Sequence, residues 1–344
     1  MLFRKSFIIL LFLPLYSFPQ NNYVFQHLTV EDGLLSNPRV NVFQDAEGFY
    51  WFSSASGIQR FDGKNFISYI YANNGTKNST GEWVGKPVED KEKNIWIFND
   101  DGISIYQRKH GTFARLYLND AADSNVNNVS AIIKDEQQQI WIITTRNIFL
   151  YNYESRQAVL FSNILNDANS SIAAAIYDTK RNNFWLLISR NGSYEIALFD
   201  YIKKQITWQI NTVVKDLLHS YKTISLFKLD GSGNIWMSDF AGNFCRYNTL
   251  THQLSHYSIL QEANSQKNRL NYSEIYDFID DENGTIWFGG ESIGLLKYNK
   301  SSDSFTSIKF ENGSEYGLHY DQTIFSFLIQ VFKLLHFRIK NVHS

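Results

Sequence analysis

The sequence lacks most of the features that mark catalytic and nucleic-acid-binding proteins. It has one cysteine in 344 residues, Cys245, which excludes an internal disulfide. Its net charge is −2, so it lacks the basic excess that binding to nucleic acid requires. It contains no glycine-rich phosphate loop, nucleophile elbow or paired-cysteine motif. Because Cys245 lies in a run of strand-forming residues, we expect it to be a small buried hydrophobic residue.

Long apolar runs are also scarce, and the clearest one lies at the N-terminus. Arg4 and Lys5 precede an almost wholly apolar segment, residues 7–16. This segment is shorter than the roughly 20 residues that cross a membrane as a helix. Its length and position are typical of a secretory signal. We therefore expect residues 1–20 to be a signal peptide, with an uncleaved N-terminal anchor as the alternative.

What the sequence does contain is a repeat of about 45 residues. An aspartate stands six residues before most of the repeated tryptophans, and in the fourth copy Thr179 takes this place beside Asp178. The tryptophans recur at intervals of 45, 45, 44, 51 and 51 residues, at Trp51, Trp96, Trp141, Trp185, Trp236 and Trp287. The aspartates are Asp45, Asp90, Asp135, Asp230 and Asp281. A period of this size indicates an array, a solenoid or a propeller.

Each repeat alternates turn signals with short runs of strand-forming residues. The position three before the tryptophan should turn the chain with a positive φ, which glycine adopts without strain. Lys93 and Gln138 suit this position less well. Glycine occupies it at Gly48, Gly233 and Gly284. Runs such as Ile-Trp-Ile-Phe at 95–98 are rich in residues that favour strands. Four short strands in about 45 residues is the size of one propeller blade.

We therefore predict an all-β fold, a β-propeller of four-stranded antiparallel blades. Stacked blades bury both faces of each sheet, and the large aromatic residues fill the space between them. Six blades are recognisable, at about residues 38–70, 83–118, 128–161, 171–210, 221–257 and 272–310. Together they form one propeller domain over residues 21–322.

A seventh copy begins but is not completed. Gly317-Leu318 and residues 323–329 match the start of a blade, but no turn or tryptophan follows in the sequence. We interpret residues 323–344 as a partial strand of a seventh blade followed by an aberrant tail, produced by truncation or a frameshift near residue 329. A natural amphipathic tail is the alternative.

The first repeat also resembles a known family. The run Leu28-Thr-Val-Glu-Asp-Gly-Leu, with the later Asp45, Gly48, Trp51 and Phe61-Asp-Gly, is similar to the two-component regulator propeller repeat. The resemblance covers about residues 23–320. It implies the periplasmic sensor region of a hybrid two-component histidine kinase, of the type that Bacteroidetes use to detect glycan fragments. In that family a membrane helix and kinase modules follow the sensor, and this sequence contains neither.

The resemblance implies a non-enzymatic binding protein with an oligosaccharide ligand and no cofactor. It implies a homodimer in the full-length sensor, and contact with the membrane only through the missing downstream parts. An exported propeller enzyme, such as a polysaccharide lyase, and a protein-interaction scaffold are the alternatives. A lyase needs a convergent set of His, Tyr, Arg or a metal at the propeller axis. The expected inner-strand positions are mainly Ser, Asn, Val and Ile, which disfavours a lyase.

The candidate ligand-binding residues come from loops expected on one rim of the propeller. Loops between the second and third strands and loops between blades lie on the same rim, where propellers usually bind ligands. Arginine suits bidentate recognition of a carboxylate or sulfate on a sugar, and aromatic residues suit stacking on a sugar ring. The candidates are Arg39, Trp83, Asp100, Arg146, Arg190, Asp239, Tyr272 and Glu291.

We expect the repeated residues to be structural. An aspartate at one fixed turn position in most repeats bonds nearby backbone amides, so we assign it no catalytic role. His252 and His256 are four residues apart, a spacing that suits a metal only on a helix, and they lie in a predicted strand and turn. The sequence thus predicts no catalytic residue and no metal site.

Overall fold

The computed structural model describes residues 28, 30–35, 41–54, 57–70, 85–99, 102–118, 128–165, 167, 169–191, 193–210, 224–239, 243–258, 274–280, 284–291 and 294–308. Within these ranges the regular structure is β-strand apart from one short 3-10 helix, η1 (Val30–Asp32). Several predictions fall outside the described residues. These are the signal peptide, the seventh blade, the repeat residue Asp281 and the site candidates Arg39, Trp83, Asp100 and Tyr272.

Six sheets of four strands account for the described β-structure. Blade one contains β1 (Asn41–Gln44), β2 (Tyr50–Ser54), β3 (Gly57–Phe61) and β4 (Phe66–Ile70). Blade two contains β5 (Val88–Glu89), β6 (Ile95–Asn99), β7 (Gly102–Gln107) and β8 (Thr112–Leu116). Blade three contains β9 (Val129–Lys134), β10 (Ile140–Thr144), β11 (Asn147–Asn152) and β12 (Gln157–Asn163). Blade four contains β13 (Ser170–Asp178), β14 (Asn183–Arg190), β15 (Ser193–Asp200) and β16 (Gln205–Ile210). Blade five contains β17 (Ile224–Leu229), β18 (Asn234–Asp239), β19 (Asn243–Asn248) and β20 (Leu254–Ser258). Blade six contains β21 (Glu274–Asp280), β22 (Ile286–Glu291), β23 (Gly294–Asn299) and β24 (Ser304–Ile308).

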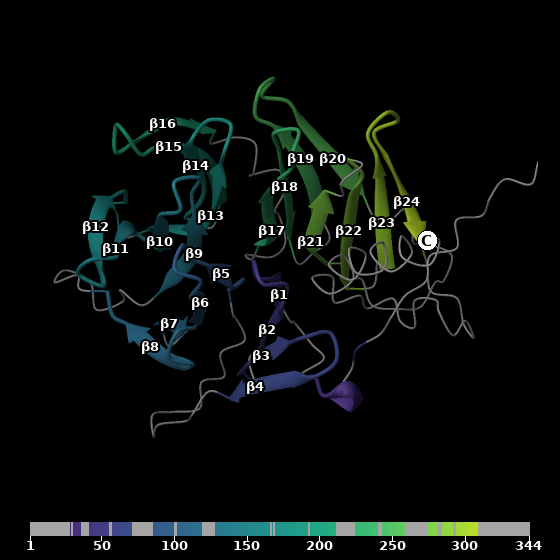
Figure 1. Ribbon diagram of the computed structural model, residues 1–344. Helices are drawn as coiled ribbons and strands as arrows, with labels where there is room; N and C mark the ends of the chain where they lie inside the picture. Colours follow the sequence, from purple (N-terminus) through teal and green to yellow (C-terminus); the bar gives the residue numbers. More distant parts are fainter. Residues whose placement is uncertain are drawn as a thin grey trace, which may run out of the picture.

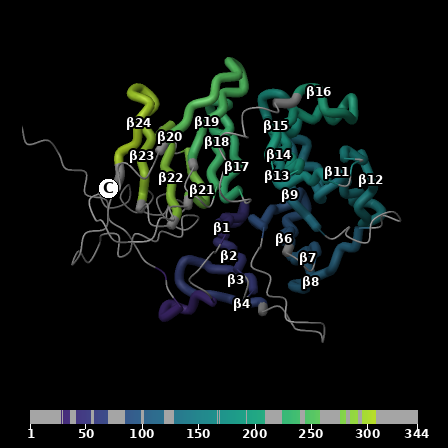
Figure 2. Tube along the Cα trace, turned by 180° about the vertical axis from the view of Figure 1, so that it is seen from behind, coloured from purple at the N-terminus to yellow at the C-terminus, as the bar shows by residue number. Residues whose placement is uncertain are grey.

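The sheets are arranged around a common centre. Each strand pairs antiparallel with the next one along the chain, as β1 pairs with β2 and β2 with β3. Figure 1 shows the first strand of each blade nearest the centre, and Figure 2 shows the same order from behind, with β4, β8 and β12 at the periphery. The prediction of a propeller with six four-stranded antiparallel blades is confirmed.

The repeated aspartate and tryptophan are hydrogen-bonded to each other. The indole Nε1 donates to the aspartate Oδ2 at 2.7 to 2.9 Å in the pairs Trp51–Asp45, Trp96–Asp90, Trp141–Asp135 and Trp236–Asp230. The other carboxylate oxygen accepts the backbone amides of the turn, as Asp45 Oδ1 accepts from Phe49 N at 2.9 Å. The carboxylate therefore closes the turn and also satisfies a buried indole N–H that would otherwise lack a partner.

The residue three before each tryptophan adopts a positive φ in all six blades. The φ angles are 92° at Gly48, 68° at Lys93, 63° at Gln138, 54° at Asn182, 87° at Gly233 and 72° at Gly284. Lys93 and Gln138 therefore adopt the left-handed conformation in spite of their side chains. Oδ1 of Asp90 and of Asp135 accepts the amide of the residue that follows, Asn94 or Gln139, and these bonds stabilise the left-handed conformation.

The tryptophans of the first five blades each pack against an aromatic residue of the following blade. Ring centroids lie 5.1 Å apart for Trp51 and Tyr106, and 4.7 Å apart for Trp96 and Tyr151. The later joints pair Trp141 with Phe184, Trp185 with Tyr247 and Trp236 with Tyr298. Because each joint buries a tryptophan and a large ring, aromatic contacts form the core between blades.

Cys245 lies in β19 and is 2% exposed, in the cluster that joins blades four and five. Burial raises the pKa of its thiol.

Candidate functional site

Two of the predicted rim arginines lie on neighbouring blades, and one of them pairs with a carboxylate in the link between these blades. Arg146 lies in the turn between β10 and β11, and Arg190 ends β14. Asp167 belongs to the link between β12 and β13, and Arg190 Nη1 lies 3.2 Å from its Oδ2. The nearby Ser170 hydroxyl lowers the pKa of the Asp167 carboxyl, as do the charges of Arg190 and Arg146. We call Arg146, Asp167, Arg190 and Glu195 the rim cluster.

The charge of Arg190 is already balanced within the rim cluster. Its Nε lies 3.4 Å from Oε2 of Glu195, whose side chain is largely buried. Its guanidinium thus lies between two carboxylates, and the two arginines and two acids of the rim cluster sum to zero formal charge. The cluster offers hydrogen-bond donors and acceptors rather than excess positive charge, which suits sugar hydroxyls better than an isolated anion.

Backbone hydrogen bonds hold this part of the rim together. The carbonyl of Thr145 accepts from the amide of Ile172 in the next blade at 2.7 Å. The carbonyl of Arg146 accepts from the amide of Ile164 at 3.1 Å. These bonds join the turn of blade three to the first strand of blade four and to the link between the two blades. They therefore fix the backbone that carries the rim cluster.

The remaining candidates behave differently. Asp239 is the last residue of β18, where it pairs with Ile224 of β17, and it has no exposed surface. The predicted loop position of Asp239 is therefore wrong, because β18 extends to it, and its role in ligand binding stays a prediction. Glu291 ends β22, and its side chain is not described. The other four candidates lie outside the described residues, as noted above.

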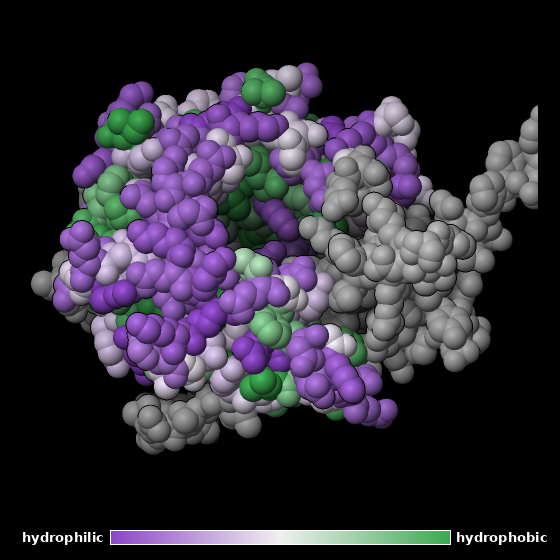
Figure 3. Space-filling view, viewed as in Figure 1, coloured by the Kyte–Doolittle hydropathy of each residue, from purple (hydrophilic) through white to green (hydrophobic). Residues whose placement is uncertain are grey.

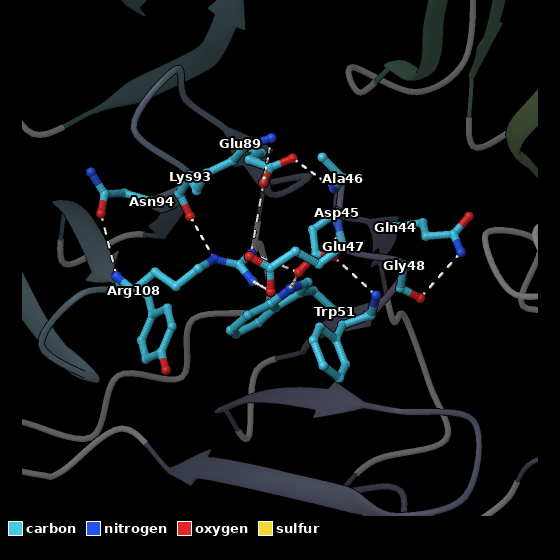
Figure 4. Close-up of polar contacts among 12 residues, drawn as sticks. Gln44, Asp45, Ala46, Glu47, Gly48, Trp51, Glu89, Lys93, Asn94 and Arg108 are labelled. Carbon is cyan, nitrogen blue, oxygen red and sulfur yellow. Dashed lines mark hydrogen bonds and ion pairs between the residues drawn. The ribbon is translucent and has the colours of Figure 1, made fainter.

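Sequence reasoning missed Arg108, which lies in the turn between β7 and β8 and joins blades one and two (Figure 4). Its Nη2 lies 2.7 Å from Asp45 Oδ2, its Nη1 lies 2.6 Å from Glu47 Oε2, and its Nε donates to the carbonyl of Lys93 at 2.9 Å. Burial alone would raise the pKa of Asp45, but the bonds from Trp51 and Arg108 outweigh it, so the pKa of this carboxyl is lowered. Arg108 stands in one repeat only, so repeat alignment gave no signal for it.

The described residues contain no group of three or more His, Cys, Asp or Glu side chains able to hold a metal ion. His252 stacks on Trp208 of the preceding blade at 5.0 Å and hydrogen-bonds through Nδ1 to the Tyr247 hydroxyl at 2.6 Å. His256 lies opposite Cys245 in the pairing of β20 with β19. Over the same described ranges, no helix is long and apolar enough to span a membrane.

The fold is similar to that of several solved structures. The chain matches the crystal structure of the extracellular domain of the hybrid two-component system BT3049 from B. thetaiotaomicron with a TM-score of 0.64, at 20% identity over 88% of this chain and 39% of that one. The extracellular domain of the hybrid two-component system BT4673 from the same organism matches with a TM-score of 0.59, at 22% identity over 83% of this chain and 38% of that one.

The fold is shared with extracellular domains of two-component systems. The chain spans about two fifths of the length of these domains. A propeller enzyme matches as well, since virginiamycin B lyase from Staphylococcus aureus gives a TM-score of 0.58 at 12% identity, over 84% of this chain and 91% of that one. No family model matches the sequence, and no curated protein is similar to it at a significant level.

Proposed function

We propose that this chain is the ligand-sensing propeller of a hybrid two-component sensor kinase, exported to the periplasm, and that its ligand is a glycan fragment. The observation that carries the proposal is the structural likeness to extracellular domains of two-component systems over 82 to 88% of the chain. The repeat residues of the first blade support it independently, because they resemble the two-component regulator propeller repeat. The role is binding rather than catalysis.

The rim cluster is the place where we expect the glycan to bind. Arginine and carboxylate side chains in alternation supply donors and acceptors for hydroxyl groups. Arg190 and Asp167 keep 38% and 43% of their side-chain surface, so a ligand can reach them. Their pairing with each other fixes their positions before a ligand arrives, which reduces the entropy lost on binding.

Titration calorimetry of the whole chain against a panel of neutral and acidic oligosaccharides tests the proposal. We expect at least one saccharide to bind, and Arg146→Gln to weaken it about tenfold. Arg156→Gln is the matched control, because Arg156 lies on the same blade in the turn between β11 and β12, at the other end of the sheet. Binding by no saccharide, or equal effects of the two variants, would contradict the proposal.

Signalling needs more than the propeller. We propose that ligand binding shifts a homodimer of the full-length sensor between two arrangements, and that the membrane and kinase parts read this shift. The predicted signal peptide, residues 1–20, would direct export, and the partial seventh copy at 317–329 would add to the ring. Sedimentation of the full-length sensor with and without ligand would detect the dimer.

A propeller lyase is the second candidate, and the likeness to virginiamycin B lyase is the observation that favours it. Lyase action on a polysaccharide creates an unsaturated product that absorbs in the ultraviolet. Incubation of the chain with polyuronides, followed by absorbance, separates the two candidates. A lyase produces a steady rise in absorbance, whereas a sensor produces none.

A further inference from the structure

One position in the repeat changes character in a single blade. The residue that pairs with the repeat tryptophan on the neighbouring strand is apolar in blades one, two, three, four and six. In blade five it is a lysine. The apolar residues are Phe43, Val88, Ile133, Ile176 and Ile279, and the exception is Lys228, opposite Trp236. The other blades therefore show that an apolar residue is sufficient to pack this position. Departures from a local rule without a packing reason are expected at functional sites.

A second departure lies beside the first, in the next blade. The second position after the tryptophan, in the second strand of a blade, pairs with a residue of the first strand. This partner is Asp277 in blade six, whereas in blades one, three, four and five it is Asn41, Ala131, Ala174 and Leu226, respectively. Lys228 Nζ lies 2.6 Å from Oδ1 of Asp277 and also donates to the carbonyl of Phe278. Burial lowers the pKa of the Lys228 ammonium, although the Asp277 charge opposes this. The two exceptional residues are thus partners of each other.

A third charge reaches the same carboxylate from a non-consecutive blade. Lys86, just before β5 of blade two, has its Nζ 3.9 Å from Oδ2 of Asp277. Blades two and six are not neighbours in chain order, and Figure 1 shows β5 and β21 on different sides of the centre. The contact therefore crosses the middle of the propeller. Two ammonium groups and one carboxylate leave one positive charge there, since the nearby Asp280 is itself 3.7 Å from Lys300.

The side chains of Lys86, Lys228 and Asp277 are partly exposed to solvent, although the apolar side chains next to them are buried. Lys86, Lys228 and Asp277 keep 53%, 33% and 21% of their side-chain surface, whereas Trp236 and Phe278 keep 2% or less. Gly289 stands opposite Asp277, so the residue paired with Asp277 has no side chain that could cover the carboxylate. Figure 3 shows the surface hollowed at the centre of the molecule, with hydrophilic as well as apolar residues inside.

We propose that Lys86, Lys228 and Asp277 form an axial binding site for the acidic group of a saccharide, a carboxylate or a sulfate. Lys86 supplies the unbalanced positive charge, and Lys228 supplies a second hydrogen-bond donor. Asp277 orients both lysines and accepts a hydrogen bond from a sugar hydroxyl. This site deepens the proposed function, on which it rests, by naming the class of glycan. It differs from the rim cluster, whose charges cancel.

Calorimetry of the whole chain with trigalacturonate, a sulfated disaccharide and maltotriose tests the axial site. We expect an acidic probe to bind and Lys86→Gln to weaken it about tenfold. Lys93→Gln is a matched control, because Lys93 is 50% exposed and also lies 3.9 Å from one carboxylate, that of Glu89. Gln138 already shows that glutamine tolerates the positive φ of this repeat position. The carboxylated and sulfated probes distinguish the two sources of the anion.

Each result decides the proposal. Equal affinity of the Lys86→Gln and Lys93→Gln variants, or tighter binding of maltotriose than of both acidic probes, overturns the axial site. Binding of a neutral glycan, with no binding of either acidic probe, overturns this site but leaves the sensor function standing. The double variant Lys228→Ile/Asp277→Ala, which restores residues found in blade four, should stay folded and lose the acidic probe. Retained affinity in that folded variant also overturns the site.

Discussion

Trp185 donates its indole Nε1 to Oδ2 of Asp178 at 3.0 Å across seven residues, whereas the equivalent described pairs span six. The turn of blade four is one residue longer, and Arg181 in that turn contacts the same carboxylate at 2.6 Å. Thr179, which has the regular spacing, is not the partner. The hydrogen bond between carboxylate and indole is thus present in blade four even though the number of residues between its two partners differs.

The first prediction concerns this bond. Asp230 accepts from Trp236 Nε1 at 2.8 Å and from the backbone amides of Ser232 and Asn234 at 2.8 and 2.9 Å. Asp230→Ala leaves the buried donors of Trp236 and Asn234 unsatisfied, so we expect a loss of about 3 kcal/mol in the free energy of unfolding. Urea denaturation followed by tryptophan fluorescence measures it. Asp62→Ala, in an exposed turn with similar amide bonds but no indole, should have a far smaller effect. Equal losses would contradict the assigned role.

The second prediction concerns acid stability at the joint of blades one and two. The pKa of Asp45 is lowered in the folded state relative to about 3.9 in the unfolded chain. Its contribution to stability is therefore present above about pH 4 and is lost as the pH falls through the folded pKa. Arg108→Met should lower the free energy of unfolding by about 2 kcal/mol at pH 7, and this deficit should shrink at pH 3.

Urea denaturation at the two pH values measures the effect of Arg108→Met. Arg156→Met is the control, since Arg156 forms an exposed ion pair with Glu92, and we expect a change of about 0.5 kcal/mol or less. A deficit that stays constant between pH 7 and pH 3 would show that Arg108 acts through packing rather than through the Asp45 charge.

The third prediction concerns the left-handed turn position. Gln138 adopts a φ of 63°, a conformation that costs a residue with a side chain roughly 1–2 kcal/mol. Gln138→Gly should therefore raise the free energy of unfolding by about 0.5 kcal/mol, after subtraction of the extra freedom of glycine in the unfolded chain. Gly48→Ala is the reciprocal variant, since an added Cβ meets nothing within 4 Å and isolates the backbone term. Opposite shifts in the urea midpoint support this account, and two shifts of the same sign refute it.

The fourth prediction concerns the half-buried pair Lys228–Asp277 of blades five and six. Lys228→Ile alone leaves the Asp277 carboxylate without its close partner, so we expect a loss of about 2–3 kcal/mol. Adding Asp277→Ala should restore stability to within about 1 kcal/mol of the natural chain, because replacing both partners leaves no charge without its partner. A double-mutant cycle in urea measures the coupling. Losses that simply add would show that the pair has no mutual dependence.

The fold was predictable because one strong signal recurs six times. Trp, Asp and a turn residue repeat at nearly fixed spacing, and each copy supports the interpretation of the others. Lys93 and Gln138 were harder to place, since their conformation follows from strand pairing and not from their own preference. The partner of Trp185 was also ambiguous, because a one-residue insertion moves Asp178 away from the regular position.

The candidate sites were less predictable, for two physical reasons. Arg146 and Arg190 were named from loop position, but Asp167, the partner of Arg190, lies in a link that composition marks only as a loop. Aligning the repeats on their shared residues does not reveal positions at which one blade differs from the others. Lys228 and Asp277 are such positions, and the strand register identifies them. Asp239 was misplaced because loop composition does not reveal where a strand ends.

The aromatic joints have a direction. In every described joint the tryptophan belongs to the earlier blade and its ring partner to the later one, as Trp51 meets Tyr106 and Trp236 meets Tyr298. The two sides of a blade are therefore unlike surfaces, and the joint is a head-to-tail contact rather than a two-fold one. Two copies of this propeller cannot associate symmetrically by reusing the joint, so a symmetric dimer must employ a different surface of the molecule.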